Sequence, residues 1–210
     1  PYFFKQTSSG LNLDRACGSL ARSRLQRSAG RITRHHALND LVWRALGRAK
    51  VPAVKEPVGL MRSDGKRPDG LTQIPWQAGK CMTWDVTVTD TLAESYLPAT
   101  SSSGGSAAEG AANRKELKYQ ALARTHTFIP LAFETFGPIN SKGVLFLNQL
   151  GRRLTANTGD LRETVFLFQR LSVTIQRFNA VCFKKSFYFN TIQTVGSIST
   201  FIIFFLSFFF

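Results

Sequence analysis

Two aspartates and two lysines in this chain have the residue types and spacing that could support chemistry at a metal ion. Asp69 follows Pro68 near the start of a predicted strand, and Asp85 lies in the next strand. Lys115 and Lys118 fall on a helix further along the chain. Two carboxylates on neighbouring strands repel each other unless a cation lies between them. Asp69 and Asp85 are therefore a candidate cation site.

The strand that carries Asp85 spans residues 81–90 and is rich in β-branched residues. Side chains two apart in a strand share a face. The face expected to join the core contains Met82, Trp84, Val86 and Val88. The opposite face contains Thr83, Asp85 and Thr87. Asp85 therefore needs a charged partner or solvent, and Asp69, at the turn of the preceding strand, is the nearest acidic candidate.

The helix predicted from Ala108 to Arg124 supplies the basic groups. One stripe of this helix contains Ala108, Ala111, Ala112, Lys115, Tyr119 and Leu122, with Lys118 at its edge. Lys115 therefore lies near the centre of the face that should pack on the sheet, where an amine is costly unless it reaches a charge or a reacting group. The alternative is that its stem covers apolar surface while its amine reaches water or Glu109.

The elements that must position these residues follow from the hydrophobic periodicity. A helix runs from Ala37 to Pro52 with Leu38, Leu41, Val42, Ala45, Leu46 and Ala49 on one face. Residues 54–62, 67–76 and 81–90 indicate three consecutive strands. A buried strand follows at 127–136, and two further helices are expected at about 144–155 and 160–181. The predicted class is α/β, in the order α-β-β-β-α-β followed by two helices.

The composition indicates an intracellular protein with a polyanionic partner. The 210 residues carry a formal net charge of +14, which favours binding to nucleic acid or to an anionic membrane face. Three widely separated cysteines argue against a disulfide framework. We expect a basic, flexible arm at 1–33, a folded domain at 34–182, and a phenylalanine-rich apolar tail at 183–210. Because the sequence begins at Pro1 without Met, we expect a fragment of a larger protein.

Several ordered motifs resemble one known family. RHHALNDLVWRAL, KEPVGL, RPDG, TWDVTV, AAEGAANRKELKY and FIPLAFETFGPI occur in the order found in the restriction-like endonuclease domain of site-specific non-LTR retrotransposons. That domain is a branch of the PD-(D/E)xK nuclease superfamily and usually lies C-terminal to a reverse transcriptase. The resemblance covers about Arg34 to Asn140 and implies a PD-(D/E)xK core.

The resemblance implies a metal-dependent DNA endonuclease that nicks target DNA. Asp69 and Asp85 would hold Mg²⁺ or Mn²⁺, and Lys115 or Lys118 would orient or deprotonate the attacking water. Tyr119 would pack against DNA or hydrogen-bond a phosphate, or else be a core tyrosine. The expected partners are DNA and element RNA, and the expected location is the nucleus. The residues expected to contact nucleic acid are Arg31, Arg34, His35, Lys66 and Arg67.

The chain also departs from the family pattern. The superfamily lysine usually stands two residues after the second acidic residue, where this chain has Thr87. The role must therefore move to the helix lysines, or the enzyme is inactive. Cys17, His35 and His36 are the remaining candidates for the zinc knuckle of the family, and three ligands do not complete a structural zinc site, so we predict no zinc.

Two alternatives to an active nuclease remain. The first is a catalytically inactive, retroelement-derived remnant that still binds nucleic acid. The second is a tail-anchored membrane protein, because the chain has no charged residue after Lys185 and ends in SISTFIIFFLSFFF. In that case residues 186–210 would form the transmembrane segment, with Lys184 and Lys185 on the cytoplasmic side. The tail is otherwise a non-native extension.

Overall fold

The computed structural model describes residues 30–188, with side chains described as far as Phe183. One compact unit, Ala29–Ala180, contains the elements that position the site. Nearly all of the predicted basic arm, and the tail from residue 189 onward, lie outside the described residues. Within residues 30–188, no helix is both long enough and apolar enough to cross a membrane.

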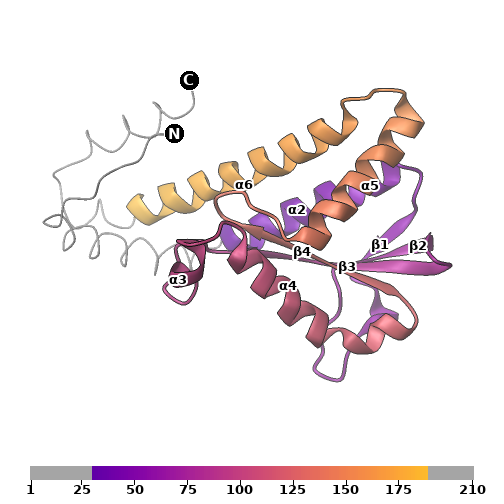
Figure 1. Cartoon of the computed structure of the whole chain (residues 1–210), viewed down its shortest axis with the longest axis horizontal. Helices are drawn as coiled ribbons and strands as arrows, with labels where there is room; N and C mark the ends of the chain where they lie inside the picture. The colour runs from indigo at the N-terminus through magenta and orange to yellow at the C-terminus, as the bar shows by residue number, and fades with distance from the viewer. Residues whose placement is uncertain (1–29, 189–210) are drawn as a thin grey trace, which may run out of the picture. The chain divides into compact units, whose positions relative to one another are not determined.

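The described residues form an α/β fold with a mixed four-stranded sheet, which confirms the predicted class (Figure 1). The strands lie in the order β1-β2-β3-β4, where β1, β2 and β3 pair antiparallel and β4 is parallel to β3. The strands are β1 (Ala53–Lys55), β2 (Gly70–Gln77), β3 (Lys80–Thr89) and β4 (Thr127–Glu134). The α-helices are α2 (Gly30–Arg48), α3 (Leu97–Thr100), α4 (Ser106–Lys118), α5 (Ser141–Thr158) and α6 (Glu163–Tyr188).

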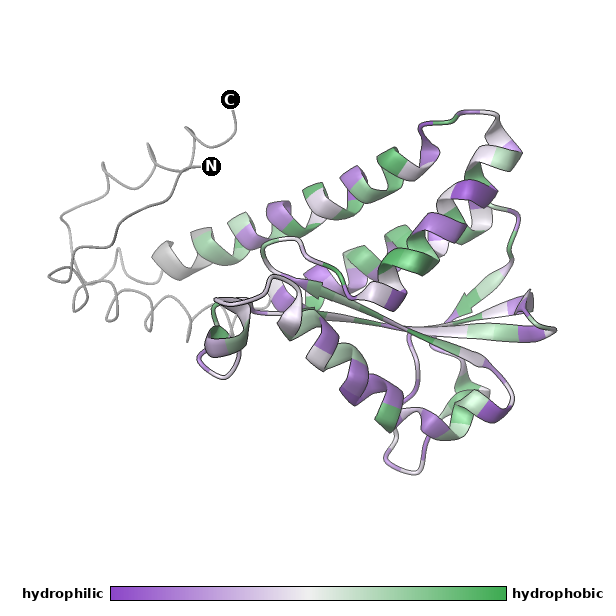
Figure 2. Cartoon of the chain, in the orientation of Figure 1, coloured by the Kyte–Doolittle hydropathy of each residue, from purple (hydrophilic) through white to green (hydrophobic). Residues whose placement is uncertain are grey.

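The helices cover the two faces of the sheet unequally. Figure 1 shows α4 on one face and α2, α5 and α6 on the other. The main core joins α2, α5 and α6 to one side of β3 and β4, with Trp84, Phe133 and Phe146 among its fully buried side chains. The alanines of α4 pack against Ala132 on the other side. Figure 2 shows hydrophilic and hydrophobic residues alternating around the helices, as expected when one face packs and the other is solvated.

Helix α2 begins at Gly30, seven residues before the predicted start at Ala37. The apolar periodicity marks only the part of the helix that packs on the core, because the earlier turns make polar contacts instead. Arg34 donates a hydrogen bond to Asn179 of α6 at 2.6 Å, and the His35 imidazole lies against Asp69. The boundary of the flexible arm at residue 33 was therefore placed inside a helix.

The first predicted strand is much shorter than the sequence indicated. Strand β1 ends at Lys55, where Glu56 adopts a positive φ of 50°, and a 3₁₀-helix follows at Val58–Leu60. Pro57 precedes that helix and has no backbone N–H for a sheet. The predicted helix 108–124 also changes character, because α4 ends at Lys118 and a 3₁₀-helix spans Gln120–Arg124. The other predicted helices and strands are present, although α6 runs seven residues past its predicted end at 181 and the short helix α3 was not predicted.

Candidate functional site

Asp69 immediately precedes β2, and Asp85 lies on the neighbouring antiparallel strand β3. The pairing of the two strands ends at Gly70 with Trp84, the residues next to Asp69 and Asp85 in the sequence. The backbone N–H of Asp69 donates to the carbonyl oxygen of Trp84 at 2.9 Å, which continues the pairing beyond β2. The negative charge of Asp69 raises the pKa of Asp85, so the structure brings near each other the two carboxylates that the sequence paired.

Gly70 allows this close approach of the strands. A Cβ atom at this position would lie 2.0 Å from Cζ2 of Trp84, so the indole occupies the space that any other residue would need. The indole Nε1 donates to Asn39 Oδ1 of α2 at 2.8 Å, and the Asn39 amide nitrogen lies 3.4 Å from the carbonyl oxygen of Asp69. The core on one face of the sheet thus sets the backbone position of Asp69.

The side chain of Asp69 is held by two donors. Its Oδ2 accepts a hydrogen bond from the backbone N–H of Val86 at 2.6 Å and lies 2.9 Å from Nε2 of His35. The hydrogen bond to the carboxylate raises the pKa of His35, against the lowering effect of burial. Oδ1 of Asp69 makes no hydrogen bond within residues 30–183, so one oxygen is free to bind another group.

Asp85 is the most buried charged group of the site, with 5 % of its side chain exposed. The amine of Lys115 lies 2.5 Å from its Oδ2, and the hydroxyl of Tyr119 lies 3.2 Å from its Oδ1. Burial, and then the negative charge of Asp69, raises the pKa of Asp85, against the lowering effect of Lys115. A buried carboxylate beside a second carboxylate is costly to keep ionised, and such perturbed groups are concentrated at functional sites.

Lys115 and Lys118 occupy different positions around Asp85. Lys115 is the direct ion-pair partner, with 27 % of its side chain exposed. The alternative partner predicted for it, Glu109, instead accepts a hydrogen bond from the backbone N–H of Ser141 at 2.5 Å. The amine of Lys118 donates to the Tyr119 hydroxyl at 3.0 Å, and burial, followed by the charge of Lys115, lowers the pKa of Lys118. The geometry favours Lys115 for a role at Asp85.

Tyr119 follows the last turn of α4, which carries both lysines, and links this turn to the strands. The residue is 1 % exposed, and its ring packs on Phe128 with centroids 4.8 Å apart. Its single hydroxyl hydrogen is shared between the carbonyl oxygen of Arg67 at 2.9 Å and Oδ1 of Asp85 at 3.2 Å. Burial and the adjacent carboxylate raise the pKa of Tyr119, which keeps the hydroxyl a donor. Tyr119 therefore orients Asp85 from within the core.

The basic residues predicted to contact nucleic acid are dispersed. Arg31 and Lys66 are exposed, whereas Arg67 forms an ion pair with Glu56. Arg34 is 5 % exposed and donates to Asn179, so its guanidinium lies inside the fold rather than on a nucleic-acid surface. His35 is turned toward Asp69, and it belongs to the site as a partner of that carboxylate.

The contact between His35 and Asp69 was missed by the sequence reasoning. His35 and Asn39 are four residues apart on α2, and both reach Asp69, one at its side chain and one at its backbone. Residues at this spacing lie on the same helix face. Two polar residues in line beside an apolar stripe were the available signal, but nothing in the local pattern identifies the strand that they meet.

The carboxylate pair fits a hard divalent ion that keeps most of its water. Mg²⁺ is usually bound through one or two carboxylates together with water and phosphate oxygens. Asp69 and Asp85 supply that number of carboxylates, and Oδ1 of Asp69, which accepts no hydrogen bond from the described residues, can serve as a metal ligand. Among the described residues, no group of three or more His, Cys, Asp and Glu side chains is arranged to hold a metal ion. Any ion here would therefore complete its shell with non-protein oxygens.

Neither of two comparisons with known proteins identifies a family for this chain. No protein-family model matches the chain. A search of curated proteins also returns no match. The relationship to retroelement endonucleases therefore remains a resemblance of ordered motifs, and the functional proposal depends on the residues around Asp85.

Proposed function

We propose that this chain is a metal-dependent DNA endonuclease of retroelement origin, with a PD-(D/E)xK core, that hydrolyses phosphodiester bonds and nicks target DNA. One observation carries the proposal. The Lys115 amine lies 2.5 Å from a buried Asp85 carboxylate, and Asp69 is close enough for its charge to raise the pKa of Asp85. The element order of residues 30–134 supports the proposal, because it follows the α-β-β-β-α-β order that the motif resemblance implies, with the short helix α3 before α4.

Lys115 on α4 can supply the positive charge that the superfamily pattern places at position 87, where this chain has Thr87. Thr87 and Asp85 are two residues apart on β3 and share the face that α4 covers. A lysine at position 87 would project into the same region that Lys115 reaches from α4. A positive charge beside the carboxylate pair is thus supplied by a different element, and the chemistry needs only its location.

Each side chain of the site then has a defined task. Asp69 and Asp85 would hold Mg²⁺ or Mn²⁺, which when bound acidifies a water and offsets charge developing on the phosphate. His35 and the backbone N–H of Val86 hold one oxygen of Asp69 and leave the other free. Lys115 would donate hydrogen bonds to the attacking water or to the phosphate, as an ammonium does in such sites.

Plasmid nicking tests the proposal directly. The full chain, incubated with supercoiled DNA and Mg²⁺, should produce nicked circles, and EDTA should prevent this. Asp85→Asn and Lys115→Met should each lower the nicking rate by about 10²-fold or more, the usual range for lost acid–base or electrostatic groups. Asp160→Asn, which removes a carboxylate from the loop between α5 and α6, is the charge-matched control. Nicking by Asp85→Asn at the parental rate would contradict the proposal.

A second candidate is an inactive remnant that binds nucleic acid. The ion pair between Lys115 and Asp85 favours it, because the amine already neutralises the buried carboxylate without any metal ion. Mn²⁺ titration followed by electron paramagnetic resonance separates the two candidates independently of activity. Binding that is lost in Asp85→Asn supports the nuclease, whereas no binding to the parent chain supports the remnant.

A further inference from the structure

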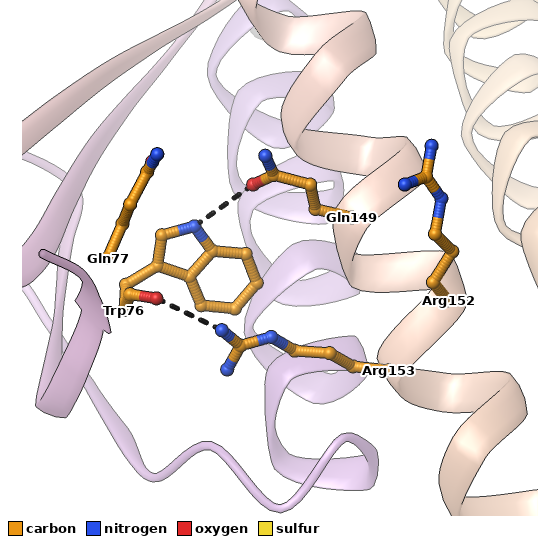
Figure 3. Close-up of a pocket in the computed structure, with 5 residues that line it drawn as sticks. All are labelled: Trp76, Gln77, Gln149, Arg152 and Arg153. Carbon is orange, nitrogen blue, oxygen red and sulfur yellow. Dashed lines mark hydrogen bonds between the residues drawn. The ribbon is translucent and has the colours of Figure 1, made fainter.

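A shallow pocket lies where the end of β2 meets α5, at the end of β2 opposite Asp69 (Figure 3). Its volume is about 290 Å³, enough for a phosphate group with several waters, since one water takes about 30 Å³. The lining residues are Trp76, Gln77, Gln149, Arg152 and Arg153. Two of these side chains are positively charged and none is acidic, which gives the pocket a preference for an anion.

Arg153 is held in place by the tryptophan. Its guanidinium carbon lies 3.8 Å from the centroid of the Trp76 ring, and its Nη2 donates to the carbonyl oxygen of Trp76 at 3.0 Å. A guanidinium has five N–H donors, and within residues 30–183 only this one N–H of Arg153, on Nη2, forms a hydrogen bond. Neither Arg152 nor Arg153 forms an ion pair with a described carboxylate. A preorganised and unneutralised guanidinium is therefore available to a ligand.

The pocket presents hydrogen-bond donors, and its tryptophan is not open for stacking. Arg153 covers one face of the Trp76 ring, Phe146 contacts the ring with centroids 5.4 Å apart, and Trp76 is 5 % exposed, so its ring is not available to a nucleobase. The indole Nε1 donates to Oε1 of Gln149 at 3.3 Å, which occupies the acceptor of that amide and leaves its NH₂ group. Figure 3 shows Trp76 between Gln149 and Arg153, whereas Arg152 projects on the other side of the α5 ribbon in this view.

We infer that this pocket is a phosphate-binding site that takes a backbone phosphate of nucleic acid, distant from the bond that the Asp69 and Asp85 site would cut. Guanidinium groups match the oxygens of phosphate with paired hydrogen bonds. Strand β2 has 8 residues, so the pocket lies on the order of 20 Å from Asp69 at about 3.3 Å per residue. The nucleic-acid ligand rests on the proposed function, whereas the preference for phosphate rests on the pocket alone.

Salt-dependent DNA binding tests this inference without requiring catalysis. Fluorescence anisotropy of a labelled duplex with the full chain, in EDTA and over a range of salt concentrations, gives the slope of log K against log salt. The double variant Arg152→Gln/Arg153→Gln should reduce the slope by about one to two, near 0.9 for each phosphate contact. Arg170→Gln, an exposed arginine of α6 outside the pocket, should leave it unchanged.

A single variant and a titration with inorganic phosphate complete the test of the pocket. Because Arg153 also covers Trp76, the single variant Arg152→Gln, at an exposed position, is measured beside the double variant and should lower the slope by about one. Titration with inorganic phosphate, followed by tryptophan fluorescence, tests the other source of the ligand. An unchanged DNA slope together with a phosphate response lost in the variants would overturn the nucleic-acid ligand and retain the phosphate site. If the variants change neither the salt slope of DNA binding nor the response to phosphate, the inference is overturned.

The nuclease proposal and the phosphate-pocket proposal can each be contradicted without contradicting the other. DNA binding in EDTA does not depend on cleavage, so Asp85→Asn should retain the parental salt slope even when it abolishes nicking. Conversely, a chain that nicks DNA at the parental rate after loss of both pocket arginines, with no change in the salt slope, would keep the nuclease and exclude nucleic acid as the ligand of the pocket.

Discussion

Replacing Lys115 with methionine should destabilise the fold through Asp85. Methionine has a similar length and helix propensity, so the change removes mainly the ammonium. Removing one partner of a fully buried ion pair costs about 3–5 kcal/mol, because an uncompensated charge remains. Lys115 is 27 % exposed, and Tyr119 still donates to the carboxylate, so we expect a loss of about 2–3 kcal/mol in the free energy of unfolding at neutral pH. The melting temperature should fall by about 5–10 °C.

Lys115→Met should have little effect on the stability of the fold once the Asp85 carboxylate is neutral. In an Asp85→Asn background, Lys115→Met should cost less than about 0.5 kcal/mol, which gives a coupling energy of about 2 kcal/mol. The pH dependence has a defined sign. The pKa of Asp85 is raised in the fold, so the folded state binds the proton more tightly and stability falls as pH rises from 3.8 through the folded pKa. The penalty of Lys115→Met should therefore disappear in acid, where Asp85 is protonated.

Urea unfolding of the full chain in EDTA, followed by circular dichroism, measures all four corners of the cycle. Lys142→Met is the matched control, since Lys142 pairs with Glu116 at 2.6 Å but is 62 % exposed. An exposed pair of this kind contributes less than about 1 kcal/mol. The predicted coupling between Lys115 and Asp85 is refuted if Lys115→Met lowers the free energy of unfolding by the same amount with and without the Asp85 carboxylate. It is also refuted if the loss is no larger than that of Lys142→Met.

Two further predictions concern the elements that position the site. Gly70→Ala should cost about 3 kcal/mol in urea unfolding, because its Cβ would meet the Trp84 indole at 2.0 Å, whereas Gly47→Ala, with no atom within 4 Å, should be neutral or slightly stabilising. Equal effects of these two changes would contradict the packing argument. Glu134→Gln should cost about 1–2 kcal/mol, because this fully buried carboxylate accepts hydrogen bonds of 2.9 and 3.2 Å from backbone N–H groups at the start of α4. The exposed Glu94→Gln is its control, and an unchanged melting temperature for Glu134→Gln would exclude the capping role.

The local periodicities predicted most of the fold and half of the site. Alternation along residues 81–90 assigned Trp84 to the core and Asp85 to the opposite face, and the burial of Trp84 in the main cluster confirms the first assignment. The 3.6-residue period of α4 placed Lys115 toward the sheet, where its amine meets Asp85. These relations depend on the geometry of one element at a time, which is why the sequence predicts them.

The missed features depend on contacts between distant segments. The start of α2 at Gly30 and the contact of His35 with Asp69 rely on residues that lie 34 positions apart or more. The end of β1 depends on the positive φ of Glu56, which no hydrophobic pattern marks. The partly buried position of Arg153 over Trp76 joins residues that lie 77 positions apart. Periodicity carries no information on which surfaces meet.

The sequence by itself therefore determined the class of the fold, the order of its elements, and the faces on which Asp85 and Lys115 lie. Only the tertiary structure decided that Lys115, and not Lys118, contacts Asp85, and that His35 holds Asp69. The physical reason is that both lysines lie on neighbouring parts of one helix surface, and the rotation and height of α4 over β3 choose between them. Packing of the alanine face of α4 on Ala132, together with Glu134 at its first turn, sets that position.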